Sequence, residues 1–415
     1  MSAAESGDVR AWEPAPRMRG FGPSIFSEMT QLAQGTGAIN LGQGFPDTDG
    51  PDGLLKAAAN AVGSGRNQYP PAAGLPELRA AVADHRTRHG LGPRYRPEDG
   101  EVVITTGATE AIAAAVLAFC GNGDRLLTFD PCYDSYAAVA RLAGAELVPV
   151  PLAVDGDGFA LDADALRAAA VSALARVLLL NTPHNPTGKV FTPAELADIA
   201  DVCREHDLVV VTDEVYEHLV YDGRAYETIA GLPGMRERTV VISSAGKTFS
   251  VTGWKVGWAC GPAKLINPLL SAKQFLTFGS GTPLQDAVAR VLASSEDCDT
   301  WIRSLSCSLQ RRRDLLREGL ERAGLRTFRA EGGYFLQTDI RSWGYEDDVR
   351  FCRELPERAG VVAVPASAFY QGQDSPRWLA RFAFCKREEV LREAVARLAG
   401  AADALGRNWP GVTPV

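Results

Sequence analysis

The chain has 415 residues, of which 46% are hydrophobic and 23% are charged, so it has ample material for a large buried core. Its formal net charge of −8 argues against a nucleic-acid partner held mainly through phosphate contacts. Eight scattered cysteines without a C-x-x-C pair are typical of reduced thiols in the cytoplasm, and five histidines without H-x-x-x-H spacing argue against a metal site.

The N-terminal segment, residues 1–17, is polar and rich in Ala and Pro, so we expect no signal peptide. No apolar run in the sequence is long enough to cross a bilayer. We expect loose order to about residue 21, a helix over 24–33, and then a short strand that enters a Gly-rich turn by residue 47. This turn lacks the spacing of a dinucleotide fingerprint.

A site for an anion is expected early in the chain. After two helices over 52–62 and 74–89, a buried strand at 101–105 leads into the small residues 106–110, which open a helix. Strand, small-residue turn and helix N-terminus together bind anions such as phosphate, because free N–H groups point outward there. The alternative is a plain helix start with Thr109 as its capping residue.

Apolar strands alternate with helices through the middle of the chain. Strands are expected at 125–129, 146–149, 176–180 and 208–211, with a capped helix over 192–206. This alternation predicts a parallel sheet covered by helices on both faces, in which ligands bind at the carboxyl ends of the strands. Candidate functional residues follow five of the predicted strands: Thr106, Tyr133, Asn185, Asp213 and Lys247.

The last of these lies in residues 243–258, where a lysine stands among Ser, Ala and Gly after an apolar run. Such a lysine can bind phosphate or form a Schiff base with a carbonyl compound. A phosphate-binding loop needs a glycine where Val241 stands, so we favour the Schiff base. An ordinary surface lysine in a flexible loop is the alternative.

Beyond residue 261 the pattern changes to helices at 265–276, 283–294 and 299–323, followed by short strands and a closing helix at 387–405. We expect three parts: an N-terminal arm with part of a small domain (1–45), a large domain (46–289) and a small C-terminal α+β domain (290–415).

Four phrases of this sequence together carry a family resemblance. They are Asn-Leu-Gly-Gln-Gly-Phe-Pro-Asp at 40–47, Asn-Pro-Thr-Gly at 185–188, Asp-Glu-Val-Tyr at 213–216 and Ser-Ala-Gly-Lys-Thr-Phe at 244–249. The chain resembles pyridoxal-phosphate aminotransferases of fold type I, class I/II. It is most similar to the branch that contains kynurenine, methionine and actinobacterial N-succinyldiaminopimelate aminotransferases. The resemblance implies an α/β fold with a mostly parallel central sheet, helices on both faces and a smaller α+β domain.

The resemblance implies a role for each residue around the cofactor. Lys247 would hold pyridoxal 5'-phosphate as a Schiff base and later move the substrate Cα proton. Asp213 would keep the pyridine nitrogen protonated, and Tyr133 would stack on the ring. Asn185 and Tyr216 would bind the phenolic oxygen, and Asn185 is also expected to meet the substrate. Taken singly, Asp213 could be a helix cap, Asn185 a turn residue and Tyr133 a core aromatic.

The cofactor phosphate would lie on the backbone of Ala108 and Thr109, with Ser244 and Lys255 beside it. Many relatives carry arginine where Lys255 stands, so a point charge here replaces a two-pronged donor. Tyr69 resembles a tyrosine that reaches the phosphate from the neighbouring subunit. The resemblance therefore implies a homodimer with its active sites at the interface.

For the substrate, Arg381 is the expected partner of the α-carboxylate, because an arginine in an apolar strand is costly unless it is paired. A structural salt bridge is the alternative. Gly44 would offer its backbone to the same carboxylate, while Phe278 and Tyr334 would line the side-chain pocket. Some kynurenine-type relatives have a histidine where this chain has Gly279, which weighs against kynurenine and predicts a roomier pocket.

We therefore expect a cytoplasmic, homodimeric aminotransferase that moves the amino group of an L-amino acid to a 2-oxo acid by a ping-pong route. A pyridoxal-phosphate β-lyase acting on cysteine conjugates through the same lysine and arginine is the alternative enzyme. A regulator with an aminotransferase-like sensor domain ranks last, because the segment before the first helix is short and the charge is acidic.

Overall fold

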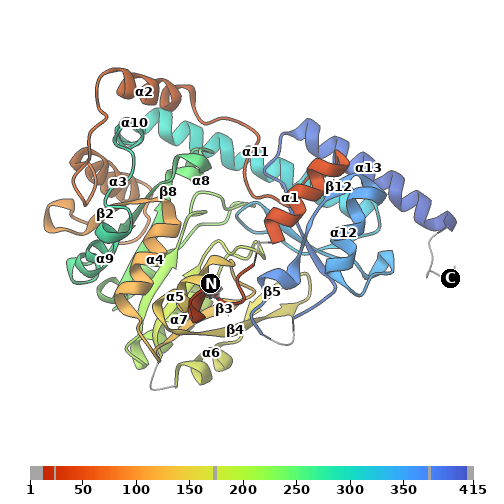
Figure 1. The fold of residues 1–415 in the computed structure, drawn as a ribbon, viewed down its shortest axis with the longest axis horizontal. Helices are drawn as coiled ribbons and strands as arrows, with labels where there is room; N and C mark the ends of the chain where they lie inside the picture. Colours follow the sequence, from red (N-terminus) through yellow and green to blue (C-terminus); the bar gives the residue numbers. More distant parts are fainter. Residues whose placement is uncertain (1–12, 23–24, 172–174, 373–374, 409–415) are drawn as a thin grey trace, which may run out of the picture.

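The computed structural model describes residues 13–22, 25–171, 175–372 and 375–408. Most of the segment expected to be loosely ordered lies outside these residues, and so does Ser24. The described part has a large sheet-based region and a smaller one, drawn in blue at the right of Figure 1. Among the described residues, no helix is long and apolar enough to span a membrane.

The large sheet has eight strands in the order β2-β9-β8-β7-β6-β3-β4-β5. Its strands are β2 (Val102–Thr106), β3 (Arg125–Asp130), β4 (Glu146–Asp155), β5 (Gly158–Leu161), β6 (Ala175–Asn181), β7 (Val209–Asp213), β8 (Thr239–Ser244) and β9 (Val256–Cys260). Neighbours from β4 through β8 pair in parallel, whereas β5 and β9 run antiparallel to their neighbours. The mostly parallel sheet expected from the sequence is confirmed.

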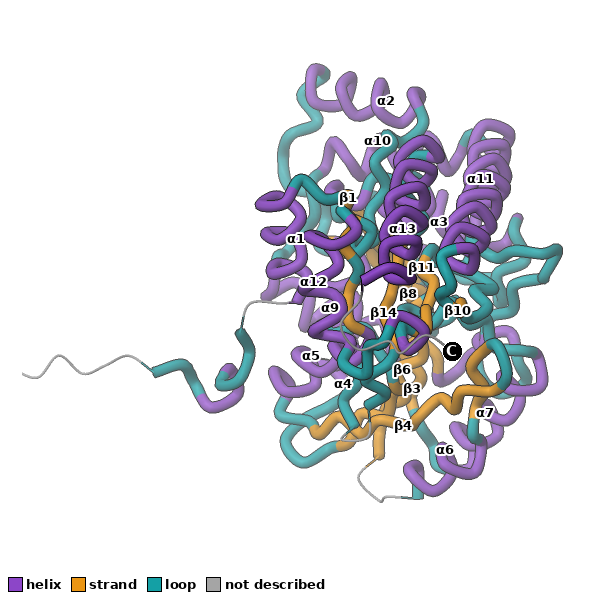
Figure 2. The backbone as a smooth tube through the Cα atoms, turned by 90° about the vertical axis from the view of Figure 1, so that its right-hand side faces the viewer, coloured by secondary structure: helices purple, strands orange, loops and turns teal. Residues whose placement is uncertain are grey.

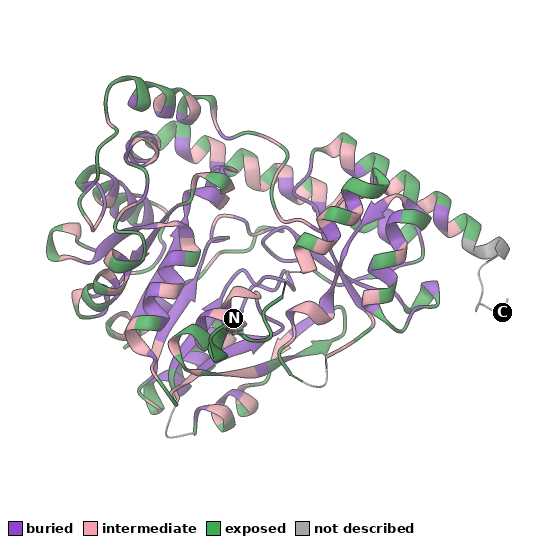
Figure 3. Cartoon of the chain, viewed as in Figure 1, coloured by how far each residue is buried: buried purple, intermediate pink, exposed green. Residues whose placement is uncertain are grey.

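Helices cover both faces of this sheet because its strands carry apolar side chains on both sides. One face packs against α4 (Gly107–Phe119), α5 (Ser135–Ala143) and α9 (Ala263–Leu276). The other face packs against α2 (Asp52–Gly63), α3 (Pro76–Arg88), α6 (Ala163–Ala170), α7 (Pro193–Glu205) and α10 (Thr282–Ala293). Figure 3 shows the resulting pattern of buried strands under helices with exposed outer faces.

The smaller region is built on the antiparallel sheet β10-β11-β14-β13 and the parallel pair β1-β12. Its strands are β1 (Ile39–Asn40), β10 (Arg326–Thr327), β11 (Phe335–Asp339), β12 (Val361–Val362), β13 (Val364–Pro365) and β14 (Leu379–Ala383). Its helices are α1 (Ile25–Thr36), α12 (Asp348–Ala359), α13 (Glu388–Asn408) and the C-terminal half of α11 (Ser295–Arg322). Figure 2 shows α11 and α13 side by side.

The N-terminal helix α1 packs on α12 of the small region. The division of the chain at residue 45 stays a prediction. Helix α11 begins against the core of α2 and α3 and ends in the core of the small region. The bounds 46–289 and 290–415 stay a prediction.

Strand β9 and helix α5 are among the elements that the sequence analysis did not predict, and the structure shows a physical reason for each. Strand β9 carries Gly257, and glycine weakens a strand pattern. A Cβ at Gly257 would lie 2.5 Å from the carbonyl carbon of Gly107, so this strand can pass the start of α4 only with glycine there. Helix α5 has only nine residues and begins two residues after Tyr133, so its apolar pattern was too short to indicate a separate helix.

Candidate active site

The carboxyl ends of the parallel strands meet around a cavity of about 270 Å³. Most residues expected from the sequence line it: Gly44, Ala108, Thr109, Tyr133, Asn185, Asp213, Tyr216, Ser244, Lys247, Lys255 and Arg381. The large region supplies most of these side chains, and the small region supplies Arg381 from β14. The cavity therefore lies where the two regions meet.

Lys247 projects from α8 (Ala245–Thr248), which follows directly on β8. Its Nζ donates a 2.8 Å hydrogen bond to the hydroxyl of Tyr334 and lies 3.5 Å from the carbonyl oxygen of Gly44. Burial lowers the pKa of this amine to about 8. A lysine with this pKa is neutral in about a tenth of the molecules at pH 7, far more than an ordinary lysine, and the neutral form is the one that acts as a base or a nucleophile.

Asp213 ends β7 and is buried at the cavity wall. The Tyr136 hydroxyl donates a 2.7 Å hydrogen bond to its Oδ2, and the Val215 N–H lies 3.3 Å from its Oδ1. Burial raises the pKa of the Asp213 carboxyl to about 6, although both hydrogen bonds oppose the shift. No Lys, Arg or His nitrogen of a described residue lies within 4.0 Å of this carboxylate, so the wall presents a buried acid suited to a cationic ligand.

The N-terminus of α4 faces the same cavity beside Lys255. Gly107 has φ +73°, and a Cβ there would lie 3.2 Å from Cε and 3.3 Å from Nζ of Lys255. Glycine therefore allows the lysine to approach the first turn of the helix. Free N–H groups, the helix dipole, Ser244 and one ammonium together form a site for a phosphate.

Arg381 is buried in β14 without a carboxylate partner among the described residues within 4.0 Å. Its guanidinium donates to Oδ1 of Asn185 at 2.8 Å and to the carbonyl oxygen of Gly42 at 3.0 Å. Phenylalanine rings surround it, with centroids at 3.9, 4.3 and 5.3 Å: Phe335, Phe369 and Phe26. Burial lowers its pKa to about 10. The alternative of a structural salt bridge is wrong for the described part of the chain.

Three expected residues do not line the cavity. Tyr69 is 86% exposed and Phe278 43% exposed, and their rings contact each other with centroids 5.7 Å apart. Tyr334 is buried against Lys247 rather than open to the cavity. Gly279 does not line the cavity either, and a Cβ there would lie 2.9 Å from Pro70, so the roomier side-chain pocket stays a prediction.

The sequence analysis missed three residues that complete the cavity. Tyr136 holds Asp213, Phe335 stacks on Arg381, and Oδ1 of Asn181 accepts a 2.7 Å hydrogen bond from the Asn185 N–H. Asn181 carried a usable signal, because a polar residue directly ended an apolar strand. Tyr136 lies inside a helix and Phe335 inside a strand, where aromatic residues are usually structural.

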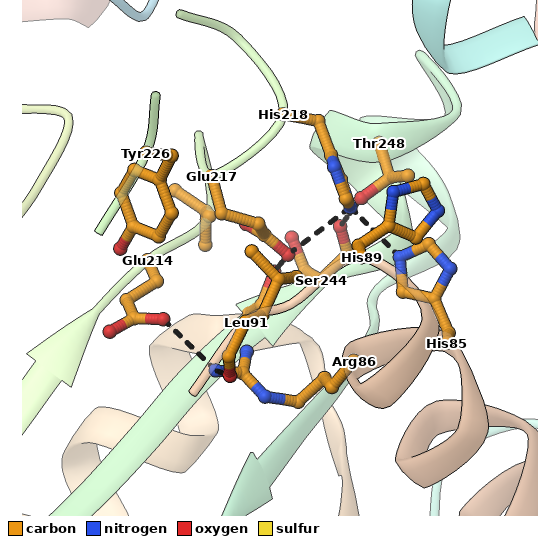
Figure 4. Close-up of polar contacts among 12 residues, drawn as sticks. His85, Arg86, His89, Leu91, Glu214, Glu217, His218, Tyr226, Ser244 and Thr248 are labelled. Atoms are coloured by element: carbon orange, nitrogen blue, oxygen red, sulfur yellow. Dashed lines mark hydrogen bonds and ion pairs between the residues drawn. The ribbon is translucent and has the colours of Figure 1, made fainter. Parts of the chain in front are cut away.

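A buried polar layer fixes the turn that follows Asp213, as Figure 4 shows. Glu214 pairs with Arg86 of α3 at 3.2 Å, with both side chains inaccessible. Oε1 of Glu217 accepts a 2.6 Å hydrogen bond from the Ser243 hydroxyl on β8, and His218 shares a 2.8 Å hydrogen bond with His85. These contacts fix the turn that bears Tyr216 relative to the strand that leads to Lys247.

The cavity fits the cofactor that the resemblance implies. Pyridoxal 5'-phosphate carries a basic ring nitrogen, an aldehyde and a phosphate. Asp213 is a buried acid without a cation, Lys247 is an amine of lowered pKa, and the start of α4 with Lys255 suits an anion. Each part of the cofactor thus has a partner of matching chemistry in one cavity.

Comparison with known proteins agrees with this fit. The family model for aminotransferase class I and II matches residues 36–398. A probable N-succinyldiaminopimelate aminotransferase of Mycobacterium tuberculosis is 51% identical over 395 residues, which is 93% of this chain and 98% of that protein. The methionine aminotransferase of Escherichia coli is 38% identical over 391 residues, 93% of this chain and 97% of that protein.

A solved structure of N-succinyldiaminopimelate aminotransferase from M. tuberculosis superposes with a TM-score of 0.90 at 51% identity, covering 94% of this chain and all of that one. These relatives are aminotransferases, so the β-lyase alternative is not favoured. The chain belongs to the class I and II aminotransferases: with pyridoxal 5'-phosphate as cofactor, it transfers the amino group of an L-amino acid to a 2-oxo acid.

Proposed function

We propose that Lys247, Asp213 and Arg381 carry out this amino transfer from one cavity. The observation that supports the proposal is their convergence there: Asp213 and Arg381 are buried, Lys247 is partly buried, and none has an oppositely charged partner within 4.0 Å among the described residues. The charge or lone pair of each group is therefore available to bind or react with a ligand. Groups with these properties that meet in one cavity are typical of an active site.

When bound, pyridoxal 5'-phosphate supplies the aldehyde that takes the amino group and a ring that accepts the electron pair left at the substrate Cα. The ε-amine of Lys247 would attach the cofactor and, once free, would take the proton from the substrate Cα and deliver it to C4′, the former aldehyde carbon. Asp213 holds a proton on the ring nitrogen, and Tyr216 and Asn185 bind the phenolic oxygen while Tyr133 covers the ring.

The remaining residues orient the two ligands. The backbone of Ala108 and Thr109 holds the phosphate together with Ser244 and Lys255. The guanidinium of Arg381 binds the substrate α-carboxylate beside the backbone of Gly44, and the surrounding phenylalanine rings keep water away from this ion pair. The substrate is thereby fixed by its carboxylate while its Cα–H faces the lysine.

Replacement of Lys247 tests the central role. Lys247→Ala should lower kcat by at least about 10³-fold, because the base and the attachment point are both lost. The visible absorption band of lysine-bound cofactor should also disappear after dialysis against an amino donor. Lys264→Ala, at an exposed position of α9, is the matched control and should keep both properties. Normal turnover by Lys247→Ala would show that the assignment is wrong.

We propose N-succinyldiaminopimelate as the amino-group substrate, which would place the protein in amino-acid biosynthesis. The support is the greater identity to the mycobacterial relative, 51% against 38% for the methionine enzyme. A panel of N-succinyldiaminopimelate, methionine and kynurenine with 2-oxoglutarate as acceptor tests this. We expect kcat/KM to be at least about tenfold higher for the first, and equal or better use of methionine would contradict the proposal.

We also propose a homodimer in which Tyr69 completes the active site of the partner. Tyr69 lies in an exposed apolar strip with Phe275 (85% exposed), Leu276 and Phe278, and a strip of this kind marks an interface. Mixing Lys247→Ala and Tyr69→Ala chains should restore activity up to about a quarter of the native value, because half of the re-formed dimers contain one intact site. If mixing restores nothing while mixed dimers form, Tyr69 does not act across an interface.

A cytoplasmic location is part of the proposal. All eight cysteines are free thiols, and seven of them are buried. This is the cysteine usage expected in a reducing compartment. Fractionation of the native host with detection of the enzyme would test it.

A further inference from the structure

Tyr334 is held in the small region by its backbone. It directly precedes β11, and its carbonyl oxygen accepts a 3.0 Å hydrogen bond from the N–H of Phe384 beyond the end of β14. The preceding Gly333 donates its N–H to the carbonyl oxygen of Leu219 at 2.8 Å and accepts a hydrogen bond from the Tyr221 hydroxyl. The position of Tyr334 is therefore fixed by neighbours on both sides.

The side chain of Tyr334 extends from this fixed backbone toward residues of the large region. Its ring is buried, packs edge-on against Tyr216 with centroids 5.1 Å apart, and lies 5.2 Å from the ring of Phe335. Its hydroxyl lies 2.8 Å from Nζ of Lys247. Burial raises the pKa of this phenol well above 10, so the oxygen meets the amine as a neutral acceptor.

The Lys247 amine has two oxygen neighbours. Its Nζ donates to the Tyr334 hydroxyl at 2.8 Å and lies 3.5 Å from the Gly44 carbonyl oxygen. Lys247 also lines the cavity, so these two contacts hold its nitrogen at the cavity wall. A nitrogen held in one place is what proton transfer at a substrate carbon needs.

The sheet that carries Tyr334 also carries the arginine for the substrate carboxylate. Gln337 of β11 stands opposite Arg381 of β14, and Phe335 stacks on the guanidinium at 3.9 Å. One sheet of the small region therefore sets the place of both the carboxylate partner and the acceptor of the lysine amine. The proton carrier and the substrate are aligned by the same element.

We propose that Tyr334 is the positioning residue of Lys247: its hydroxyl, with the Gly44 carbonyl, holds the nitrogen of the free amine in the place from which it takes the substrate proton. The inference deepens the proposed function, because it rests on the role given there to Lys247. It replaces the expectation that Tyr334 lines the side-chain pocket.

The variant Tyr334→Phe keeps the ring and removes only the hydroxyl. In cofactor-free protein, the pH dependence of the modification of Lys247 by an amine-directed reagent, read by mass spectrometry of its peptide, gives the pKa of this amine. We expect the pKa to fall by about half to one pH unit, because an acceptor that favours the ammonium form is lost. In loaded enzyme, kcat should fall by about 10–100-fold while KM for the amino donor stays within about twofold.

Tyr221→Phe is the matched control. It removes another buried hydroxyl, which binds the carbonyl of Gly333 next to Tyr334 but does not contact Lys247. It should leave the pKa of the lysine and kcat within about twofold of the native values. In a Lys247→Ala background with methylamine supplied, Tyr334→Phe should cause no further loss of the rescued rate.

Two results would overturn the inference. One is a Tyr334→Phe enzyme with native kcat and an unchanged lysine pKa; the other is a Tyr221→Phe enzyme with the same losses, which would make the role merely structural. The pKa part of each result does not depend on the role of Lys247, because the lysine pKa is measured without cofactor or turnover. Failure of the proposed function would appear separately, as normal turnover by Lys247→Ala.

Discussion

Two arginines of this enzyme are almost fully buried, and their surroundings differ in one respect. Arg86 and Arg381 are each 1% exposed. Arg86, in the layer behind the active site, has the carboxylate of Glu214 at 3.2 Å (Figure 4). Arg381, at the cavity, has an amide oxygen, a carbonyl oxygen and phenylalanine rings around it.

The pKa values of the two guanidiniums follow this difference. Burial lowers both, but at Arg86 the attraction of Glu214 and other neighbours outweighs burial and raises the pKa. Hydrogen bonding does not explain the contrast, since Nε of both arginines and NH1 of Arg86 lack a partner among the described residues. A buried cation without an anion is costly to keep. We infer that Arg86 serves the folded state, whereas Arg381 is retained for the anion of a ligand.

The largest expected effect comes from removing the charge of Arg381. Arg381→Met should lower kcat/KM for the amino donor by about 10³–10⁴-fold, since the α-carboxylate would lose the buried guanidinium that we propose as its partner. The free energy of unfolding should stay equal or rise, because the variant removes an uncompensated charge from the interior. Steady-state kinetics and urea unfolding of the same preparation measure the two quantities. Bound cofactor should be retained.

Arg381→Lys separates charge from geometry in this test. It keeps the cation but loses the planar fork, so we expect activity between those of the native enzyme and Arg381→Met. A loss of several kcal/mol of stability in Arg381→Met, with donor affinity unchanged, would reverse the assignment and make Arg381 structural.

The next largest effect is expected from Arg86, whose removal should lower the free energy of unfolding and leave catalysis nearly unchanged. Arg86→Met leaves the buried carboxylate of Glu214 without its cation, so we expect the free energy of unfolding to drop by about 3–5 kcal/mol. The kcat of the folded fraction should change by less than about threefold, because Arg86 does not line the cavity. Urea unfolding followed by circular dichroism would measure the drop.

The double variant Arg86→Met/Glu214→Gln is the matched control for this prediction. It removes both charges and keeps an acceptor near the hydroxyls of Thr212 and Thr228, so most of the lost stability should return. An Arg86→Met enzyme of native stability but low kcat would show that the two arginines do not differ as proposed.

The same contrast explains how much the sequence could predict. Lys247, Asp213 and Arg381 were found because a charged or polar residue stands out at the end of an apolar strand or within one. Parallel strands bring the ends that carry Asp213 and Lys247 to one edge, so the meeting of these two residues followed from the pattern. Arg381 lies on a strand of the small antiparallel sheet, so the strand pattern alone did not place it in the same cavity. These features are local in sequence, and the family phrases reinforced them.

Partners that come from distant segments were not predictable in this way. Tyr136 reaches Asp213 from 77 positions away, and Tyr334 reaches Lys247 from 87 positions away. Glu217 directly follows the family phrase at 213–216, and only the fold shows that its carboxyl accepts a hydrogen bond from Ser243 on a neighbouring strand. The sequence pattern indicates which residues can ionise or bind a ligand. Only the packing of the fold shows which of these residues already have a partner within the protein.

The smallest expected effect is on the pH dependence of stability and comes from Glu217, which lies with Arg86 in the polar layer behind the active site. It is fully buried, and burial raises the pKa of its carboxyl to about 8, although the Ser243 hydroxyl and Arg86 oppose the shift. Between about pH 4.5 and 8 the folded protein therefore binds a proton that the unfolded chain has released. Stability from this group is present below pH 4.5 and is lost as the pH rises toward 8, by at most about 1.4 kcal/mol per pH unit.

Glu217→Gln should remove this part of the pH dependence. Urea unfolding at pH 5.5, 6.5 and 7.5 should give a difference in unfolding free energy between variant and native enzyme that shifts in favour of the variant as the pH rises. Ser243→Ala acts in the opposite direction: it removes a hydroxyl that holds the pKa of Glu217 down, so the proton is kept to higher pH. Parallel pH profiles for the native enzyme and Glu217→Gln would mean that Glu217 is ionised inside the protein. Arg86 would then compensate two carboxylates, and the layer behind the site would carry net negative charge next to Asp213.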